Sequence, residues 1–180
     1  MSIGLKRGEV AVENHQIEWE TSAKIIIDLL KNIMKNDIVD VQHIGSTSIK
    51  SICAKPIIDI VVGVNDFNDI LKHNDILEKF GMIYRGQDHE NQHLYVCSDL
   101  QNNIQTHFIH VVIFNSKEWH DYIDMRDFLN ANEEKALEYS NLKEKLAKKY
   151  PNDRIAYTNG KSRLIEEILK NAALWRKANY

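Results

Sequence analysis

The sequence predicts an α+β fold with a helical C-terminal third, and three observations support that class. Helical periodicity appears near the N-terminus, in residues 18–35. Short β-branched runs and one further helical segment then fill residues 38–114. After Ser116 only helical periodicity remains. Strands and helices are therefore segregated along the chain, as in α+β proteins.

The size and composition predict one domain, residues 1–180, because a core of this size buries enough surface without splitting. The 43% hydrophobic and 27% charged residues are typical of globular proteins, and no apolar run reaches the roughly 20 residues that cross a bilayer. The N-terminus lacks the apolar segment of a signal peptide, and Cys53 and Cys97 lie far apart. We expect a cytoplasmic protein with free thiols and no membrane partner.

The net charge of −3 speaks against a nucleic-acid partner, which favours basic proteins. The C-terminal residues 141–180 are nevertheless basic, with ten Lys and Arg against four Asp and Glu. This segment suits either an anion or a solvated helix surface, and both interpretations stay open.

The first helix, residues 18–35, is predicted because its apolar side chains lie three and four positions apart on one face. Residues 38–44 are short, β-branched and roughly alternating, which predicts a strand ending at Gly45. Residues 56–64 form an almost continuous β-branched run, typical of a strand covered on both faces, with Pro56 at its first position.

Residues 66–80 return to helical periodicity, with Asp66 as the cap and Gly81 as the stop. Two strands follow, residues 93–98 and 104–114. The polar turn between them predicts a hairpin.

The remaining elements are helices over residues 117–130, 133–149 and 158–177, with Pro151 separating the last two. Trp119, Tyr122 and Phe128 fall at helical spacings and are expected in the core.

The segment 45-GSTS-48 follows a predicted strand, and backbone N–H groups and hydroxyls at such a turn bind anions such as phosphate. Gly45, Ser46, Thr47 and Ser48 are therefore candidates for a phosphate cradle. Asp59 interrupts the apolar strand 56–64, and a buried carboxylate has to be paired, hydrogen-bonded, metal-bound or protonated.

Structural roles remain open for both features. The serines can cap a helix, and Asp59 can pair with Lys55, Arg85 or Arg126.

Several separated blocks of the chain resemble the GrpB family. They are 43-HIGSTS-48, 54-AKPIIDI-60, 106-THFIHVV-112, 126-RDFL-129, 142-LKEKLA-147 and 153-DRIAYTNGKSRLIEEIL-169. They recur in the family's order from about Trp19 to Trp175. The resemblance implies a nucleotidyltransferase-like mixed sheet flanked by helices, similar to the polymerase-beta nucleotidyltransferases.

In that superfamily a Gly-Ser turn holds nucleotide phosphates, and three acids on two strands hold divalent metal. Gly45 and Ser46 match the turn, and Asp59 matches the first acid. Val61 stands in place of the second acid and His110 in place of the third. A magnesium pair needs several carboxylate oxygens, so these departures speak against standard two-metal nucleotidyl transfer.

The resemblance also implies a divalent metal, either Mg or Mn as in the superfamily or a transition metal held by Asp59, His110 and His43, because a mixed nitrogen and oxygen set suits zinc, manganese or iron. His107 lies three residues from His110, so the two should point to opposite faces of a strand. For His110, the roles of general base and of structural partner to Asp59 also stay open.

The segment 159-NGKSR-163 is similar to the end of a Walker phosphate-binding motif, but Ile155 stands where that motif needs glycine. The family block containing Arg154, Tyr157 and Lys161 is distinctive, so these side chains either face the cleft or form an exposed capping region.

The first functional hypothesis is a nucleotide- or phosphate-binding protein that transfers a nucleotidyl group to an acceptor that the sequence does not identify. The 45–48 turn would cradle phosphate, and Lys55, Arg126 and Lys161 would supply positive charge. Asp59 and His110 would carry the chemistry. The alternative is a non-catalytic module that kept the cleft, lost its carboxylates and assists a protein partner.

Overall fold

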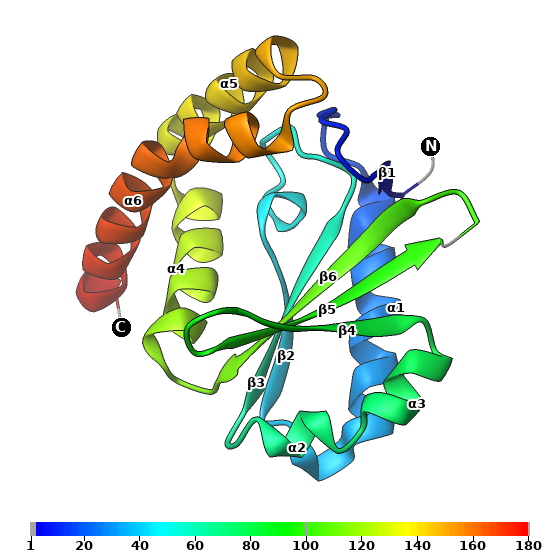
Figure 1. Cartoon of the computed structure of the whole chain (residues 1–180). Helices are drawn as coiled ribbons and strands as arrows, with labels where there is room; N and C mark the ends of the chain where they lie inside the picture. Colours follow the sequence, from blue (N-terminus) through cyan, green and yellow to red (C-terminus); the bar gives the residue numbers. More distant parts are fainter. Residues whose placement is uncertain (1–2, 100, 180) are drawn as a thin grey trace.

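The structure is a computed structural model that describes residues 3–99 and 101–179. Its strands are β1 (Leu5–Lys6), β2 (Asp40–Ile44), β3 (Ile58–Val64), β4 (Met82–His89), β5 (Gln92–Asp99) and β6 (Ile104–Ile113). Its helices are α1 (Ile17–Met34), α2 (Asn68–Leu71), α3 (Asn74–Lys79), α4 (Lys117–Ala131), α5 (Glu133–Lys149) and α6 (Arg154–Asn179). The predicted α+β class, with a helical C-terminal third, is confirmed (Figure 1).

The strands of the described residues form one mixed sheet in the order β2-β3-β6-β5-β4, with β1 pairing to β6. Strands β3 and β6 run parallel, and the other pairs are antiparallel. The register sets Ile44 opposite Asp59, and Val61 opposite His110. Because side chains alternate between the two faces of a strand, all four residues share one face.

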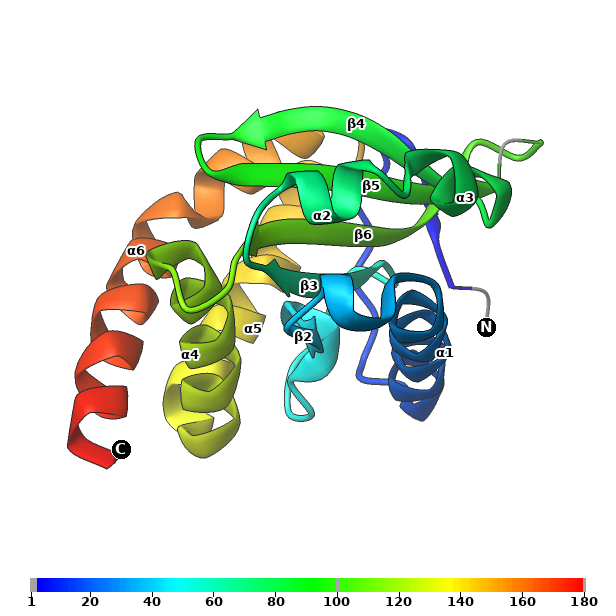
Figure 2. The ribbon, with the colours of Figure 1, turned by 90° about the horizontal axis from the view of Figure 1, so that it is seen from below.

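Helices cover both faces of this sheet. Figure 2 shows α1 on one side of the sheet and α4, α5 and α6 on the other. Trp19 of α1 belongs to the same buried cluster as Ile60 of β3. On the opposite face, Trp119 of α4 packs with Val61 and Val112. The alternation in β3 thus serves two cores, which explains its continuous apolar run. No helix in the described part of the chain is long and apolar enough to cross a membrane.

The helix predicted over residues 66–80 is instead two short helices, α2 and α3, interrupted at Lys72 and His73. Lys72 Nζ and His73 Nε2 each lie 2.8 Å from a carboxylate oxygen of Asp37, which follows α1. The break turns both side chains to this carboxylate, so a tertiary contact overrides the local helical pattern. Gly81 ends the segment as predicted, with φ of +80°.

Strand β4 was missed by the sequence pattern because it is an edge strand with mostly exposed side chains and irregular pairing to β5. Helix α6 begins at Arg154, four residues before its predicted start. Asp153 accounts for this earlier start, because its Oδ1 accepts a hydrogen bond of 2.9 Å from the amide of Ala156.

Candidate functional site

A cavity of about 450 Å³ lies on the sheet face that α4, α5 and α6 cover. Its lining includes the turn residues Gly45 and Ser46, the sheet residues Asp59 and His110, and side chains from all three helices. The predicted turn and the predicted carboxylate therefore meet in one cavity.

Asp59 and His110 are diagonal neighbours on the paired strands β3 and β6. The Nε2–H of His110 donates to Oδ1 of Asp59 across 3.2 Å. The imidazole packs at 5.1 Å from the ring of Tyr122, centroid to centroid. Within the described residues, Nδ1 of His110 is buried without a hydrogen-bond partner. The pair thus holds the carboxylate and the imidazole in a fixed orientation, and the carboxylate is the basic group of the two with an oxygen, Oδ2, that the imidazole does not contact.

Gly45 brings the backbone of the turn against Asp59. Its φ of +69° and ψ of −170° lie in a region that favours glycine. A Cβ built at this position would lie 2.5 Å from Oδ2 of Asp59 and 2.9 Å from its Cβ. Glycine is therefore required both by the backbone conformation and by the close approach of the carboxylate.

Only part of the predicted phosphate cradle faces the cavity. Thr47 is 1% exposed, and its Oγ1 lies 2.9 Å from Nε2 of His43. The hydroxyl of Ser48 donates to the carbonyl of Gly45 at 2.6 Å. Their hydroxyls are thus used within the turn, which leaves Gly45 and Ser46 as the members of the cradle that line the cavity.

His43 does not join Asp59 and His110. It pairs with Ile60 in β2–β3, so its side chain lies on the opposite face, towards α1. Burial lowers the pKa of His43 to about 4, and the imidazole is neutral at physiological pH. No three His, Cys, Asp or Glu side chains of the described residues are grouped as a metal site. The expected three-ligand set is therefore not assembled, because neighbouring strand positions alternate.

His107 points away from His110, as the spacing predicts. It pairs with Ile58, and its Nε2 lies 2.9 Å from the hydroxyl of Ser22 in α1. Burial lowers the pKa of His107 to about 4. This histidine belongs to the α1 side of the sheet and has no access to the cavity.

In the part of the chain that the structure describes, five Lys and Arg side chains line the cavity: Arg126, and a group of four, Lys55, Lys143, Arg154 and Lys161. Burial lowers the pKa of Lys55 and of Lys161 to about 8, and that of Lys143 to about 7. Within the described residues none of the four forms an ion pair. The cavity thus concentrates positive charge that no carboxylate contacts directly.

Aromatic rings and carbonyl groups hold these cations in place. The ammonium groups of Lys55 and Lys161 lie 5.4 and 4.4 Å from the ring centroid of Tyr157. Such contacts attract cations to the ring face without neutralising their charge.

The other two cations are held in the same way. The guanidinium of Arg154 lies 5.2 Å from the ring of Phe108 and donates to Oε1 of Gln105 at 2.9 Å. The ammonium of Lys143 donates to the carbonyl of Cys53 and lies 4.5 Å from the ring of Tyr139.

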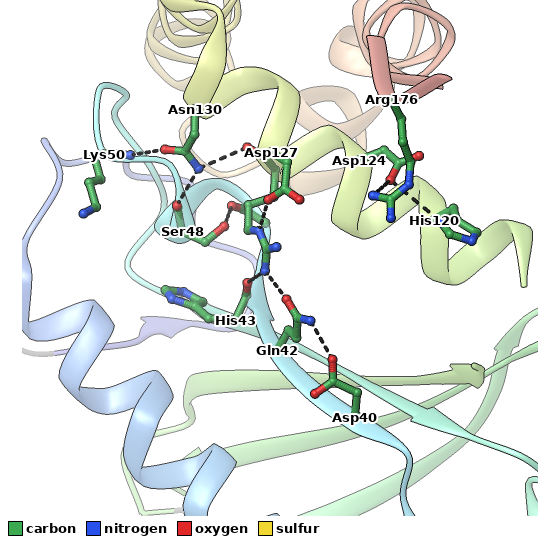
Figure 3. A network of polar contacts seen from close by, with 12 residues as sticks. Asp40, Gln42, His43, Ser48, Lys50, His120, Asp124, Asp127, Asn130 and Arg176 are labelled. Atoms are coloured by element: carbon green, nitrogen blue, oxygen red, sulfur yellow. Dashed lines mark hydrogen bonds and ion pairs between the residues drawn. The ribbon is translucent and has the colours of Figure 1, made fainter. Parts of the chain in front are cut away.

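Arg126 also lines the cavity, but its guanidinium already has partners. Its Nε donates to Asp127 at 2.7 Å, and its Nη1 donates to Oε1 of Gln42 at 2.6 Å and to the carbonyl of His43 at 3.1 Å. Figure 3 labels its partners Asp127 on α4 and Gln42 and His43 on β2, so the network joins α4 to β2. Arg126 therefore fixes the wall of the cavity, and its charge is compensated by Asp127.

Asn130 connects α4 to the turn and to the residues that follow it. Its Nδ2 donates to the carbonyl of Ser48 at 3.1 Å, and its Oδ1 accepts from the amide of Lys50 at 3.3 Å (Figure 3). The position of the Gly-Ser turn thus depends on α4 as well as on the sheet.

Sequence reasoning identified Lys55, Arg154 and Lys161 but missed Lys143 and two tyrosines. Tyr122, expected in the core, packs against the buried cluster of Trp119 and also lines the cavity. Tyr139 lines the cavity together with Ser46, and burial raises its pKa to about 12.

The comparisons with known proteins identify the family. Residues 9–171 match the sequence profile described as GrpB protein. This chain belongs to the GrpB family. The glutamate-rich protein GrpB of Alkalihalophilus pseudofirmus is 40% identical over 170 residues, which cover 93% of this chain and 98% of that protein. The UPF0157 protein YqkA of Bacillus subtilis is 30% identical over 148 residues, 82% of this chain and 43% of the relative.

Solved structures confirm the fold of this GrpB protein. The crystal structure of conserved protein GrpB from Enterococcus faecalis superposes with a TM-score of 0.83 at 29% identity, covering 90% of this chain and 96% of that one. A structure of the Cid1 poly(U) polymerase with Mg 3'-dATP bound gives a TM-score of 0.56 at 12% identity, covering 83% and 49%. The fold is thus nucleotidyltransferase-like, and the nucleotide and magnesium are properties of that polymerase.

The residues of the GrpB cavity do not fit the magnesium pair that this fold implies. Asp59 is the one carboxylate among the described residues that line the cavity. By the resemblance to the polymerase-beta nucleotidyltransferases, Val61 and His110 stand where further acids would be needed. Magnesium requires several hard oxygen ligands in near-octahedral geometry, and this donor set supplies one carboxylate and one imidazole.

Proposed function

We propose that this GrpB protein binds a nucleotide, or another small phosphorylated molecule, in the cavity between the sheet and α4–α6. The observation that supports this proposal most strongly is that Lys55, Lys143, Arg154 and Lys161 line a cavity of about 450 Å³ with a single carboxylate. That volume falls in the range of small-molecule sites, and the excess of positive charge selects an anion.

Each part of the cavity has a role in this proposal. Lys55, Arg154 and Lys161 would contact phosphate oxygens, and the amides of Gly45 and Ser46 would add donors beside them. The aromatic rings among the lining residues offer apolar surface to a base or another organic group.

Nucleotidyl transfer is the chemistry that fits this binding mode. The acceptor oxygen would bond to the α-phosphorus as pyrophosphate leaves. The carboxylate of Asp59, positioned by the Nε2–H of His110, would take the acceptor's proton, because the other ring nitrogen of His110 is buried. A divalent cation between Asp59 and the phosphates is one way to neutralise the ligand, and the four side-chain cations are another.

A thermal-shift panel tests the binding proposal. The four common nucleoside triphosphates should raise the melting temperature by about 5–10 °C, since a ligand at 100 times its Kd contributes about 2.7 kcal/mol. Lys161→Gln should reduce the shift, and Lys170→Gln, an exposed position on the same helix, should leave it unchanged. A flat panel for the unchanged protein would contradict the proposal.

A non-catalytic binding module is the second candidate, favoured by Val61 and His110 standing where acids are expected. Release of pyrophosphate from bound triphosphate, followed across a panel of hydroxyl and amine acceptors, separates the two. Release that is lost in His110→Gln supports transfer. Binding without release across the panel supports the module.

A further inference from the structure

We infer that the cavity holds a polyphosphate ligand without a divalent metal, with Lys55, Lys143, Arg154 and Lys161 as its counterions. The inference rests on the proposed function, because it concerns how the phosphorylated ligand is held in the same cavity. It specifies the ligand as one with a diphosphate or triphosphate group.

The first argument is the balance of charge. Lys55, Arg154 and Lys161 face one carboxylate, Asp59, and Lys143, with a pKa of about 7, adds a partial charge. The charge of Arg126 is compensated by Asp127. A single phosphate ester brings roughly −2, which leaves part of this positive charge without a partner. A diphosphate or triphosphate matches it better. A divalent metal would instead add charge of the sign that is already in excess.

The second argument is repulsion among the cations themselves. After burial, the presence of Arg154 lowers the pKa of Lys55, and Lys55 and Arg154 lower that of Lys161. Lys161 in turn lowers the pKa of Lys143. The four groups are thus close enough to repel one another in a partly desolvated cavity. An anion with several charged oxygens relieves this repulsion at all four groups.

The third argument is that Asp59 offers a metal little room. Its Oδ1 accepts the hydrogen bond from His110, and its Oδ2 lies against the backbone of Gly45. A metal held by Asp59 would share Oδ1 with the hydrogen bond from His110 or approach Oδ2 beside Gly45, and it would find no second carboxylate among the described residues that line the cavity. The cations, in contrast, are held only by aromatic rings and neutral oxygens, which leaves their charge available.

Calorimetric titration with ATP, ADP, AMP and inorganic triphosphate tests the inference, each in EDTA and again with excess Mg²⁺. In EDTA we expect affinity at least equal to that in Mg²⁺, and weaker binding from triphosphate to monophosphate. Lys161→Gln should weaken ATP binding roughly tenfold or more, because a charge-assisted hydrogen bond is lost. Lys170→Gln is the matched control and should bind like the unchanged protein.

Asp59→Asn distinguishes the two modes by the sign of its effect. Without a metal, removing this negative charge should tighten binding of ATP in EDTA, since like-charge repulsion is removed. If Asp59 holds a metal, the same substitution should weaken binding in Mg²⁺. Urea unfolding of each variant confirms that it is folded.

The outcomes separate this inference from the proposed function. Binding of ATP only when Mg²⁺ is present, or loss of binding in Asp59→Asn, overturns the metal-free mode and leaves the proposed function standing. Absence of binding in both buffers overturns both. Equal or tighter binding in EDTA, with the expected sign for Asp59→Asn, supports both.

Discussion

Replacing Gly45 with alanine tests the contact on which the cavity depends. The φ of +69° with ψ of −170° costs a non-glycine residue about 1–3 kcal/mol. The new Cβ would lie 2.5 Å from Oδ2 of Asp59, so the carboxylate has to move. That movement breaks the hydrogen bond from His110, which as a bond to a charged group contributes about 1.5–3 kcal/mol. We expect Gly45→Ala to lower the free energy of unfolding by about 3–5 kcal/mol.

Urea denaturation followed by tryptophan fluorescence measures this loss. Gly81→Ala is the matched control, because Gly81 has φ of +80° and no atom within 4 Å of an added Cβ. It should cost about 1–2 kcal/mol from backbone strain alone. In a double-mutant cycle, Asp59→Ala should relieve part of the cost of Gly45→Ala, giving a coupling of about 0.5–3 kcal/mol. The reasoning is refuted if Gly45→Ala costs no more than Gly81→Ala and shows no coupling.

Two further predictions concern stability. Burial lowers the pKa of Lys143 to about 7 and those of Lys55 and Lys161 to about 8, whereas a lysine in the unfolded chain has a pKa of about 10.4. Above pH 7 the unfolded chain therefore binds more protons than the folded protein, and the folded protein becomes more stable as the pH rises. The melting temperature without ligand should therefore rise from pH 7 to pH 9.5, and this rise should be smaller in Lys161→Gln. The same slope in both proteins would contradict the lowered pKa of the buried lysines. Separately, Asp124→Ala should lower the free energy of unfolding by about 1–3 kcal/mol, because buried Asp124 accepts a 2.8 Å bond from Arg176 that joins α4 to α6 (Figure 3). Asp121, which pairs with the exposed Lys117 on the same helix, is the control, and Asp121→Ala should cost about 0.5 kcal/mol in urea denaturation. Equal losses for the two variants would contradict the assignment.

The elements that the sequence predicted well are those with one dominant pattern. Helix α1 buries Trp19, Ala23, Leu30 and Met34 at helical spacing, and β3 is apolar throughout because both of its faces are covered. Strand β4 lacks such a pattern, since an edge strand with exposed side chains resembles a loop. The break between α2 and α3 depends on Asp37, which is distant in sequence.

The sequence predicted those site residues whose chemical type is unusual for their place in or beside a strand. Asp59 stands out as a carboxylate in an apolar strand, and Gly45 as the end of its neighbour. The strand pattern alone did not show that His43 lies on the other face of the sheet from Asp59, because one step along β2 moves a side chain to the opposite face. Lys143 was missed because α5 carries several lysines, and only the packing of α5 against Cys53 decides which of them is buried.

A crystal structure of the protein soaked with a nucleoside triphosphate in EDTA tests the central claim most directly. The account predicts phosphate oxygens within hydrogen-bonding distance of Lys55, Arg154 and Lys161, beside the amides of Gly45 and Ser46. Phosphates bound on another surface, or a cavity without the ligand at saturating concentration, would contradict it.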